Sequence, residues 1–282
     1  MKLFHAQSPL KLHLQPLKQA KQTIGFVPTM GAIHKGHLSL LEQALQENDI
    51  VVASIFVNPT QFNNSEDLEK YPRTLDKDIA LIQSLSDKII VYAPTVDDIY
   101  EGKTVAQSFD YDGLDNEMEG SNRPGHFNGV GTIVEKLFEI TQPTKAYFGE
   151  KDFQQLQIIR KMVAKNNMNI DVIGCPIFRE ANGLAMSSRN ERLSVQAKDK
   201  AALIYKTLKT AKTIFNEKDV KDSENFVVDA FESDPDFTLE YFIIADEATL
   251  KTAIAKEPNK KYRAFIVVHI EDVRLIDNIE LN

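Results

Sequence analysis

Short apolar runs alternate with amphipathic segments over the first two thirds of the chain. Between the first two runs, Leu38, Leu41 and Leu45 recur at spacings of three and four, which puts them on one face of a helix that begins near Gly36. Strands joined by such crossover helices are typical of a parallel sheet. The pattern therefore predicts an α/β fold, with strands at 23–27, 50–57, 88–92 and 146–148.

The character of the sequence changes after about Arg189. Two amphipathic segments predict helices, and three runs rich in aromatic and β-branched residues predict strands. We therefore expect a smaller α+β domain at this end, and we divide the chain into domains 1–177 and 178–282. The predicted helices are 194–215 and 221–231, and the predicted strands are 239–244, 263–270 and 273–279.

A long segment inside the first domain lacks clear periodicity. Residues 101–127 are rich in Gly, Asp, Asn and Pro. Long loops within compact domains usually serve a function. We predict an excursion close to a site here, and no boundary between domains.

Composition narrows the classes of function. The chain has 33 Lys and Arg against 41 Asp and Glu, a net charge of −8, which disfavours a nucleic-acid backbone as partner but leaves room for one nucleotide in a local basic pocket. Cys175 is the single cysteine, and its apolar neighbours predict a buried structural thiol. No apolar run reaches membrane-spanning length and the first residues do not resemble a signal peptide, so we expect a cytoplasmic protein without a membrane partner.

The stretch "TMGAIHKGH", residues 29–37, places two histidines where a predicted strand ends and a predicted helix begins. A helix that starts at this edge of a sheet offers unpaired N–H groups and a positive dipole end, which favour an anion. Gly31 and Gly36 remove side chains where a phosphate would approach the backbone. His34 and His37 can donate hydrogen bonds to phosphoryl oxygens. The stretch therefore predicts a phosphate site.

Two other interpretations of the histidine pair are open on these residues alone. The two side chains can be ordinary surface histidines beside a turn, or they can form part of a zinc site. The zinc interpretation is weakened by the single cysteine and by the lack of a nearby third ligand. A GxxxxGK[ST] loop is absent from the sequence, so a phosphate site has to be built without one.

A second stretch, "GLAMSSRN" at 183–190, supplies two hydroxyls and a guanidinium after a glycine-containing turn. Such groups can close over phosphates, although a Ser-Ser-Arg loop by itself is usually a solvated turn. Together with the histidine–glycine helix start, it resembles the two signature elements of the nucleotidylyl transferase superfamily, whose members activate groups with ATP.

Further motifs narrow the resemblance to one family. Two of them follow predicted strands and place amides, a cation and a carboxylate at the edge where open α/β proteins bind ligands. The resemblance spans roughly residues 23–192, and the ending "RLIDN" also fits. In chain order the six motifs resemble the pantothenate synthetase (pantoate–β-alanine ligase) family: "PTMGAIHKGH", "VNPTQF", "YPR", "RPGHFNGV", "YFGEKDFQQ" and "GLAMSSRN".

The resemblance implies an activity and an architecture. The implied reaction is the ATP-dependent condensation of (R)-pantoate with β-alanine to pantothenate, in coenzyme A biosynthesis, which releases AMP and diphosphate through a pantoyl-adenylate intermediate. The implied architecture is a Rossmann-like, doubly wound parallel sheet with a smaller C-terminal α+β lid domain, in a homodimer. ATP is the implied co-substrate, together with Mg²⁺ that is bridged mainly by the ATP phosphates, while the protein ligands of the metal are unknown.

The resemblance also assigns residues. His34 and His37 are expected at the phosphates, with His37 as the proton donor, and Lys151 and Arg189 are expected to share in catalysis. Gln61 and Gln155 are expected to hold pantoate, and Gln61 also to border the β-alanine site. The residues expected to line the ATP site are Met30, Gly31, His34, Gly36, His37, Gly149, Lys151, Asp152, Phe178, Met186, Ser187, Ser188 and Arg189.

Two positions depart from the family pattern. Phe178 stands where relatives often have an aliphatic residue, a change that a main-chain contact would survive. Asn63 and Asn64 stand where many relatives have Gly-Pro, which puts the local turn in doubt.

The alternative functions are an adenylyl or cytidylyl transferase of the same superfamily and a non-catalytic nucleotide-binding regulator. Against them, the pantoate motifs have no reason to recur in a transferase, and each motif position retains a residue able to act.

Overall fold

The computed structural model covers residues 1–282 and describes every side chain except those of Ser65 and Asp67. Its backbone contacts divide the chain into two compact units. The first unit consists of Met1–Glu150 and Gln154–Pro176, and the second consists of Lys151–Phe153 and Ile177–Asn282. The short segment Lys151–Phe153 thus belongs with the second unit, which a division of the sequence at residue 177 does not anticipate.

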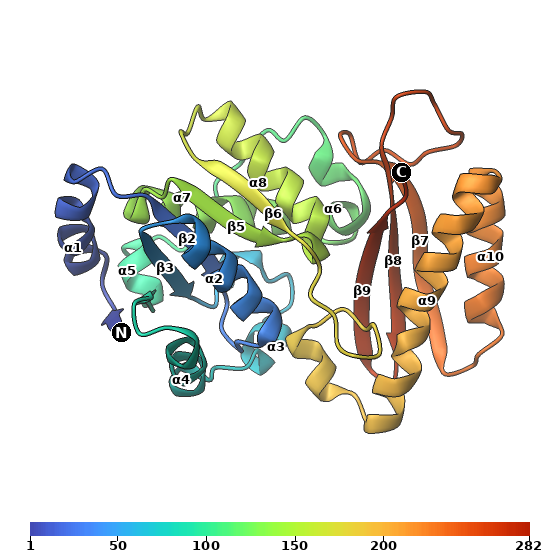
Figure 1. Ribbon diagram of the computed structural model, residues 1–282, viewed down its shortest axis with the longest axis horizontal. Helices are drawn as coiled ribbons and strands as arrows, with labels where there is room; N and C mark the ends of the chain where they lie inside the picture. Colours follow the sequence, from blue (N-terminus) through green and yellow to red (C-terminus); the bar gives the residue numbers. More distant parts are fainter. The chain divides into compact units, whose positions relative to one another are not determined.

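The first unit is built on a six-stranded sheet in the order β1-β4-β3-β2-β5-β6. Figure 1 labels β2, β3, β5 and β6 of this sheet. Each neighbouring pair runs parallel. Strands added after β2 extend the sheet on one side, and strands from β5 onward extend it on the other. This doubly wound arrangement confirms the predicted fold class. The strands are β1 (Lys2–Phe4), β2 (Ile24–Thr29), β3 (Ile50–Ile55), β4 (Ile90–Tyr92), β5 (Lys145–Gly149) and β6 (Asp171–Cys175).

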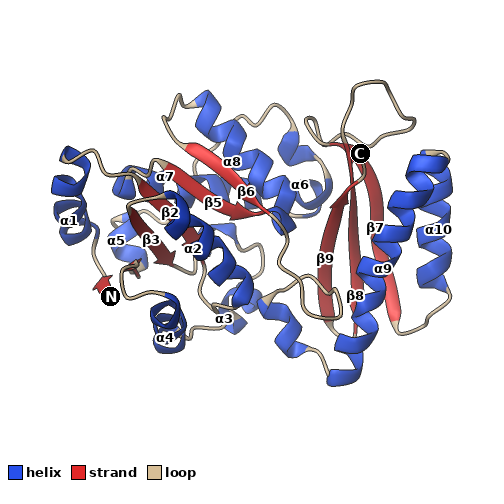
Figure 2. Cartoon of the chain, in the orientation of Figure 1, coloured by secondary structure: helices blue, strands red, loops and turns tan.

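Helices pack on both faces of this sheet (Figure 2). Val27 of β2 packs into a cluster with Leu41 of α2 (Lys35–Glu47) and Ile82 of α4 (Leu75–Leu85). The next residue back, Phe26, meets the ring of Phe138 on α7 (His126–Thr141) with 6.1 Å between centroids. Successive side chains of a strand point to opposite faces, so the central strands are buried on both sides. The other helices of this unit are α1 (Gln7–Gln19), α3 (Ser65–Lys70), α5 (Val96–Tyr100), α6 (Met118–Asn122) and α8 (Phe153–Lys165).

The four strands predicted in the first two thirds are confirmed as β2, β3, β4 and β5, with ends that differ by one or two residues. Two further strands were missed. β1 has only three residues, too few for a pattern. The apolar neighbours of Cys175 predicted a buried thiol but no strand, whereas Asp171–Cys175 form β6. Cys175 is buried as predicted, and its burial raises the pKa of the thiol to about 12.

The prediction of an irregular excursion at 101–127 is wrong in part. The segment contains the 3₁₀ helix η2 (Leu114–Asn116) and α6, and α7 begins at His126. The side chain of Gln154 holds this region, because its amide donates to Leu114 O and Glu117 O, each at 2.8 Å. Such short helices depend on a distant partner, so local periodicity does not reveal them.

The second unit contains a three-stranded antiparallel sheet in the order β7-β8-β9, with two helices packed against it. All five elements correspond to the segments predicted from sequence. The strands are β7 (Phe237–Asp246), β8 (Tyr262–Ile270) and β9 (Val273–Glu280), and the helices are α9 (Val195–Glu217) and α10 (Val220–Glu232). Among the residues that the structure describes, no helix is both long enough and apolar enough to cross a membrane.

Candidate active site

Three neighbouring strands of the first unit end where the predicted site residues begin. Thr29, the last residue of β2, pairs with Ile55, the last residue of β3, and β5 lies on the other side of β2. Parallel strands end at one edge, so the segments that follow them lie together at the point where the strand order reverses. The residues at this edge are Met30, Gly31, His34, Gly36 and His37 after β2, Gln61 after β3, and Gly149 at the end of β5.

The turn between β2 and α2 has an uncommon backbone. Gly31 has a φ of 84° and Ala32 a φ of 49°, so two successive residues are left-handed. The left-handed backbone region is unfavourable for a residue that carries a Cβ. Glycine at position 31 therefore lowers the free-energy cost of the turn. The carboxylate of Asp78 accepts hydrogen bonds from Ala32 N at 3.0 Å and Ile33 N at 2.8 Å. The turn that delivers His34 is therefore held by a side chain more than forty residues away.

Sequence reasoning did not find Asp78. It lies on α4 close to a second acidic residue, Asp76, and nothing in its spacing distinguishes it. The structure distinguishes Asp78 from its neighbours, because this residue is only 2% exposed. A buried carboxylate with backbone N–H partners fixes the geometry of the segment that supplies them.

His34 and His37 lie side by side at the start of α2. Their rings stack with centroids 4.0 Å apart, and His34 N donates to His37 Nδ1 at 3.3 Å. Nδ1 has to be unprotonated to accept this bond, so the hydrogen of the neutral ring is on Nε2. His37 is thereby held as an Nε2 donor at the N-terminal end of a helix, where the dipole favours an anion. The predicted placement of both histidines at this helix start agrees with the structure.

Gln61 ends the short 3₁₀ helix η1 (Pro59–Gln61). Asn58, only 1% exposed, donates through Nδ2 to Gln61 Oε1 and to Gly129 O, both at 3.1 Å. Asn58 Oδ1 accepts from the Tyr100 hydroxyl at 2.6 Å, and burial raises the pKa of that hydroxyl and keeps it a donor. Because the oxygen of the Gln61 amide is occupied, its NH₂ group is the part left to donate to a ligand. Asn58 belongs to the motif "VNPTQF", but the sequence alone does not mark it as a site residue.

Two residues of the motif "RPGHFNGV" hold the backbone of the same turn. His126, the first residue of α7 and 7% exposed, has Nδ1 2.8 Å from Gln61 O. A carbonyl can only accept, so Nδ1 carries the hydrogen. Arg123 Nη2 also donates to Gln61 O, at 3.4 Å. The motif therefore supports Gln61 through its main chain.

Two more predicted residues belong to this unit. Gly149 has open space beside it, since a Cβ built there meets no atom within 4 Å. Gln155 lies half-buried on the first turn of α8, next to the buried Gln154 that fixes α6 and its preceding turn. The structure thus leaves room at the end of β5 and presents an amide on the helix that follows.

The other predicted residues belong to the second unit. Lys151 and Asp152 lie in the 3₁₀ helix η3 (Glu150–Asp152). The carbonyl of Phe178 accepts from Met186 N at 3.0 Å, which closes a turn between these two residues. Phe178 is therefore held through its main chain, and its side chain is 38% exposed.

The stretch expected to close over phosphates is partly helical. Ser188 and Arg189 begin the 3₁₀ helix η4 (Ser188–Arg192), and Ser187 caps it by accepting from Arg189 N at 3.2 Å. Behind them, the buried Asn190 donates to Glu180 Oε1 at 2.8 Å and to Ala185 O at 3.1 Å. Two hydroxyls and a guanidinium are thus carried on a supported turn rather than on a plain loop.

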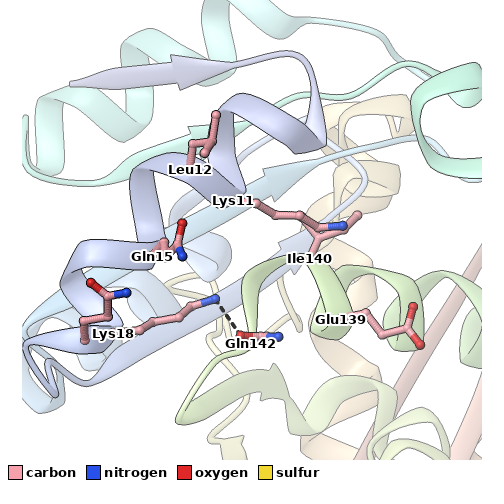
Figure 3. A pocket seen from close by; sticks show the side chains of 8 residues that line it. Lys11, Leu12, Gln15, Lys18, Glu139, Ile140 and Gln142 are labelled. Carbon is pink, nitrogen blue, oxygen red and sulfur yellow. Dashed lines mark hydrogen bonds between the residues drawn. The ribbon is translucent and has the colours of Figure 1, made fainter.

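A separate groove lies elsewhere on the first unit, between α1 and the end of α7 (Figure 3). Its volume is about 520 Å³, and Lys18 Nζ donates to Gln142 Oε1 across it at 3.0 Å. None of the predicted site residues lines it. The lining residues are Lys11, Leu12, Gln15, Lys18, Gln19, Glu139, Ile140 and Gln142.

Within the described side chains, no group of three or more His, Cys, Asp or Glu is arranged to hold a metal ion. The arrangement at the strand ends instead consists of donors. Imidazole and amide N–H groups at a helix N-terminus can bind an anion and stabilise negative charge that develops on it.

Comparison with known proteins gives one consistent result. The family model "Pantoate-beta-alanine ligase" matches residues 2–280. The pantothenate synthetase of Flavobacterium psychrophilum is 60% identical over 281 residues, which cover 100% of both chains.

Solved structures agree with this match. The pantothenate synthetase of Thermus thermophilus superposes with a TM-score of 0.90 at 38% identity, and covers 100% of this chain and 99% of its own. A pantoate-beta-alanine ligase from Francisella tularensis, complexed with beta-gamma ATP and beta-alanine, has a TM-score of 0.79 at 35% identity, with 100% and 98% covered.

We predict that Asp78→Asn loosens the turn before His34. The new NH₂ group would face a backbone N–H, so the variant should lose about 1–3 kcal/mol of unfolding free energy. The amides of Ala32 and Ile33 should also exchange with solvent faster than in the parent protein. Denaturant unfolding and hydrogen exchange measure these effects. Asp76→Asn, on the exposed side of α4, is the matched control and should stay within about 0.5 kcal/mol; equal effects of both variants would contradict the assignment.

Proposed function

Because the chain belongs to the pantoate-beta-alanine ligase family, we propose that it condenses (R)-pantoate with β-alanine to pantothenate, with ATP converted to AMP and diphosphate. The observation that carries this proposal is the pair His34 and His37 at the start of α2, where the strand order of the sheet reverses. ATP and β-alanine as substrates are supported by the Francisella tularensis structure, which is complexed with beta-gamma ATP and beta-alanine. No feature of the structure favours a nucleotidyl transferase or a non-catalytic regulator over this function.

The reaction needs ATP because a carboxylate is a poor acyl donor. Direct attack by an amine would have to expel oxide. In the proposed first step, a carboxylate oxygen of pantoate attacks the α-phosphorus, and the bond from that phosphorus to the bridging oxygen of diphosphate breaks. In the second step, the neutral amine of β-alanine attacks the pantoyl carbonyl, AMP leaves with the carboxylate oxygen, and the amine loses a proton. No covalent bond to the enzyme is required.

The contribution of the protein to the first step is positioning and charge stabilisation. Negative charge grows on the α-phosphate and on the departing diphosphate. We assign His37 Nε2 as a donor to these oxygens, because His34 N fixes the tautomer that makes it one. His34, Lys151, Ser187, Ser188 and Arg189 are proposed as the other groups that neutralise the charge.

Pantoate carries two hydroxyls and a carboxylate, which suit amide partners. Gln61 is held with its NH₂ group available, so we assign it as a donor to a pantoate oxygen. Gln155 is proposed as the second amide. Neither residue adds a charge that would compete with the reaction at phosphorus.

ATP would be bound by the residues that family resemblance assigns to it. Met30 and Gly31 lie in the turn before α2 and Gly36 lies in its first turn, where backbone N–H groups at a helix start can bind phosphates. Gly149, Lys151 and Asp152 are proposed at the nucleoside, and Phe178 is proposed as a further ATP contact. Met186 begins the segment that is proposed to close over the triphosphate. The open space at Gly149 supports this assignment.

We propose that Mg²⁺ accompanies ATP. Among the described residues the site is rich in N–H donors and has no cluster of three metal-ligating side chains, which suits a metal held mainly by phosphate oxygens. When bound, the metal would neutralise phosphate charge. Cytoplasmic location and a homodimer remain predictions that rest on the sequence and the family.

The direct test of the function is product analysis with ATP and Mg²⁺. We expect pantothenate and AMP only when pantoate and β-alanine are both present, and a pantoyl-adenylate mass in single turnover without β-alanine. A nucleotide retained on the final product would favour the transferase, and intact ATP under both conditions would favour the regulator.

We predict that His37→Ala slows adenylate formation by about 10²–10³-fold, the range for losing one transition-state donor. Rapid-quench measurement of diphosphate release gives this rate. His13→Ala, on α1, is the matched control and should keep the parent rate. A normal rate in the His37 variant would remove this residue from the chemistry.

We predict that Gln155→Ala mainly weakens pantoate binding. The lost amide should raise KM for pantoate by about tenfold, equivalent to roughly 1.4 kcal/mol, while KM for ATP stays near the parent value. Steady-state kinetics with each substrate varied in turn measure the split. Gln157→Ala, further along α8, is the control; an unchanged KM for pantoate in the Gln155 variant would refute the assignment.

A further inference from the structure

The ending "RLIDN" places two polar residues, Asp277 and Asn278, inside β9 of the second unit. Asp277 is 4% exposed and Asn278 is 1% exposed. Burying polar groups in a strand costs free energy unless each finds a partner. The function derived above does not use either residue, so their partners indicate what they do.

Asn278 joins β9 to the backbone of Lys151. Its Nδ2 donates to Lys151 O at 3.0 Å, and its Oδ1 accepts from Arg263 Nη1 at 2.8 Å. Because the amide oxygen of Asn278 accepts from Arg263, its NH₂ group is fixed toward Lys151. The Arg263 guanidinium also lies 4.0 Å from the ring centroid of Phe153, two residues after Lys151. The segment that carries Lys151 is therefore attached to the sheet at two points.

The backbone of Asn278 is itself held in place. Its N–H donates to Asp277 Oδ1 at 2.8 Å, and its carbonyl accepts from Arg179 Nη2 at 3.4 Å. Arg179 and Asp277 form a two-pronged ion pair, with distances of 2.6 and 2.9 Å. Burial raises the pKa of Asp277, and the Arg179 guanidinium opposes that rise. Such paired contacts fix orientation as well as contributing energy.

A buried ionic network of this kind is weak evidence for stability, because apolar packing can often replace it at no cost. Apolar packing would not, however, fix the position of the Lys151 segment as these contacts do. The same network also contacts the turn that leads to Met186, in the second segment assigned to ATP phosphates. There, Arg179 Nη1 donates to Gly183 O at 3.1 Å. The network thus holds the two parts of the second unit that were assigned to ATP phosphates.

We propose that Asn278 is a positioning residue for adenylation, which acts by holding the main chain of Lys151 and hence the place of its ammonium group. The inference rests on the proposed function and adds a residue more than 120 positions away from Lys151. A shift of about 1 Å in a phosphate-binding group can cost up to about a hundredfold in rate. The contribution of Asn278 should therefore exist only while Lys151 is present.

Two variants separate the contacts of Asn278. Asn278→Asp keeps an oxygen for Arg263 and loses the donor to Lys151 O, whereas Asn278→Ala loses both bonds. We expect both to lower kcat/KM for ATP by about tenfold to a hundredfold, with KM for β-alanine within about twofold of the parent. Asn282→Asp is the matched control, because Asn282 Nδ2 donates to Lys260 O at 2.9 Å just beyond the end of the same strand. It should leave both constants unchanged.

A double-mutant cycle with Lys151→Ala tests whether Asn278 acts through Lys151. In the Lys151→Ala background, adding Asn278→Asp should change kcat/KM for ATP by less than about twofold. The same fold loss in both backgrounds would overturn the proposal, because it would reveal a general structural effect. So would Asn278 variants that keep the parent kcat/KM. A parent enzyme that makes no pantothenate would instead refute the proposed function, which distinguishes the two failures.

Discussion

Parallel pairing of β2 with both β3 and β5 determines where this chain can do chemistry. Since the three strands run the same way, their carboxyl ends lie at one edge, and the reversal of strand order at β2 and β5 sends the following helices to opposite faces. His34, Gln61 and Gly149 reach the same region from distant parts of the sequence for this reason. A register slip in one strand would separate them.

Buried polar side chains hold the groups at this edge. Asp78 fixes the turn before His34, and Asn58 fixes the amide of Gln61. Asn278 does the same for Lys151 in the second unit. Donors that are oriented in advance need no reorganisation when charge develops on a phosphate, and this is the main advantage of an enzyme over water.

Much of the fold and part of the candidate site could be predicted from the sequence. Short apolar runs located the central strands, and the spacing of three leucines located α2. Amphipathic segments and runs rich in aromatic and β-branched residues located the C-terminal elements, and the histidine–glycine motif marked the helix start. Two of the supporting residues, Asp78 and Asn278, could not be found, because their partners are distant. Asp78 contacts a turn 45 residues earlier, and Asn278 contacts a carbonyl 127 residues earlier. Short elements such as β1 and α6 likewise depend on packing, which no local pattern records.

The most direct test of the account follows the oxygen atoms. Pantoate labelled with heavy oxygen in its carboxylate is converted with ATP and β-alanine, and the products are weighed by mass spectrometry. Adenylation predicts one labelled oxygen in AMP and one retained in the amide carbonyl of pantothenate. Label found in inorganic phosphate, with ADP as the nucleotide product, would mean that the carboxylate attacks the γ-phosphorus, and would contradict the mechanism assigned to this site.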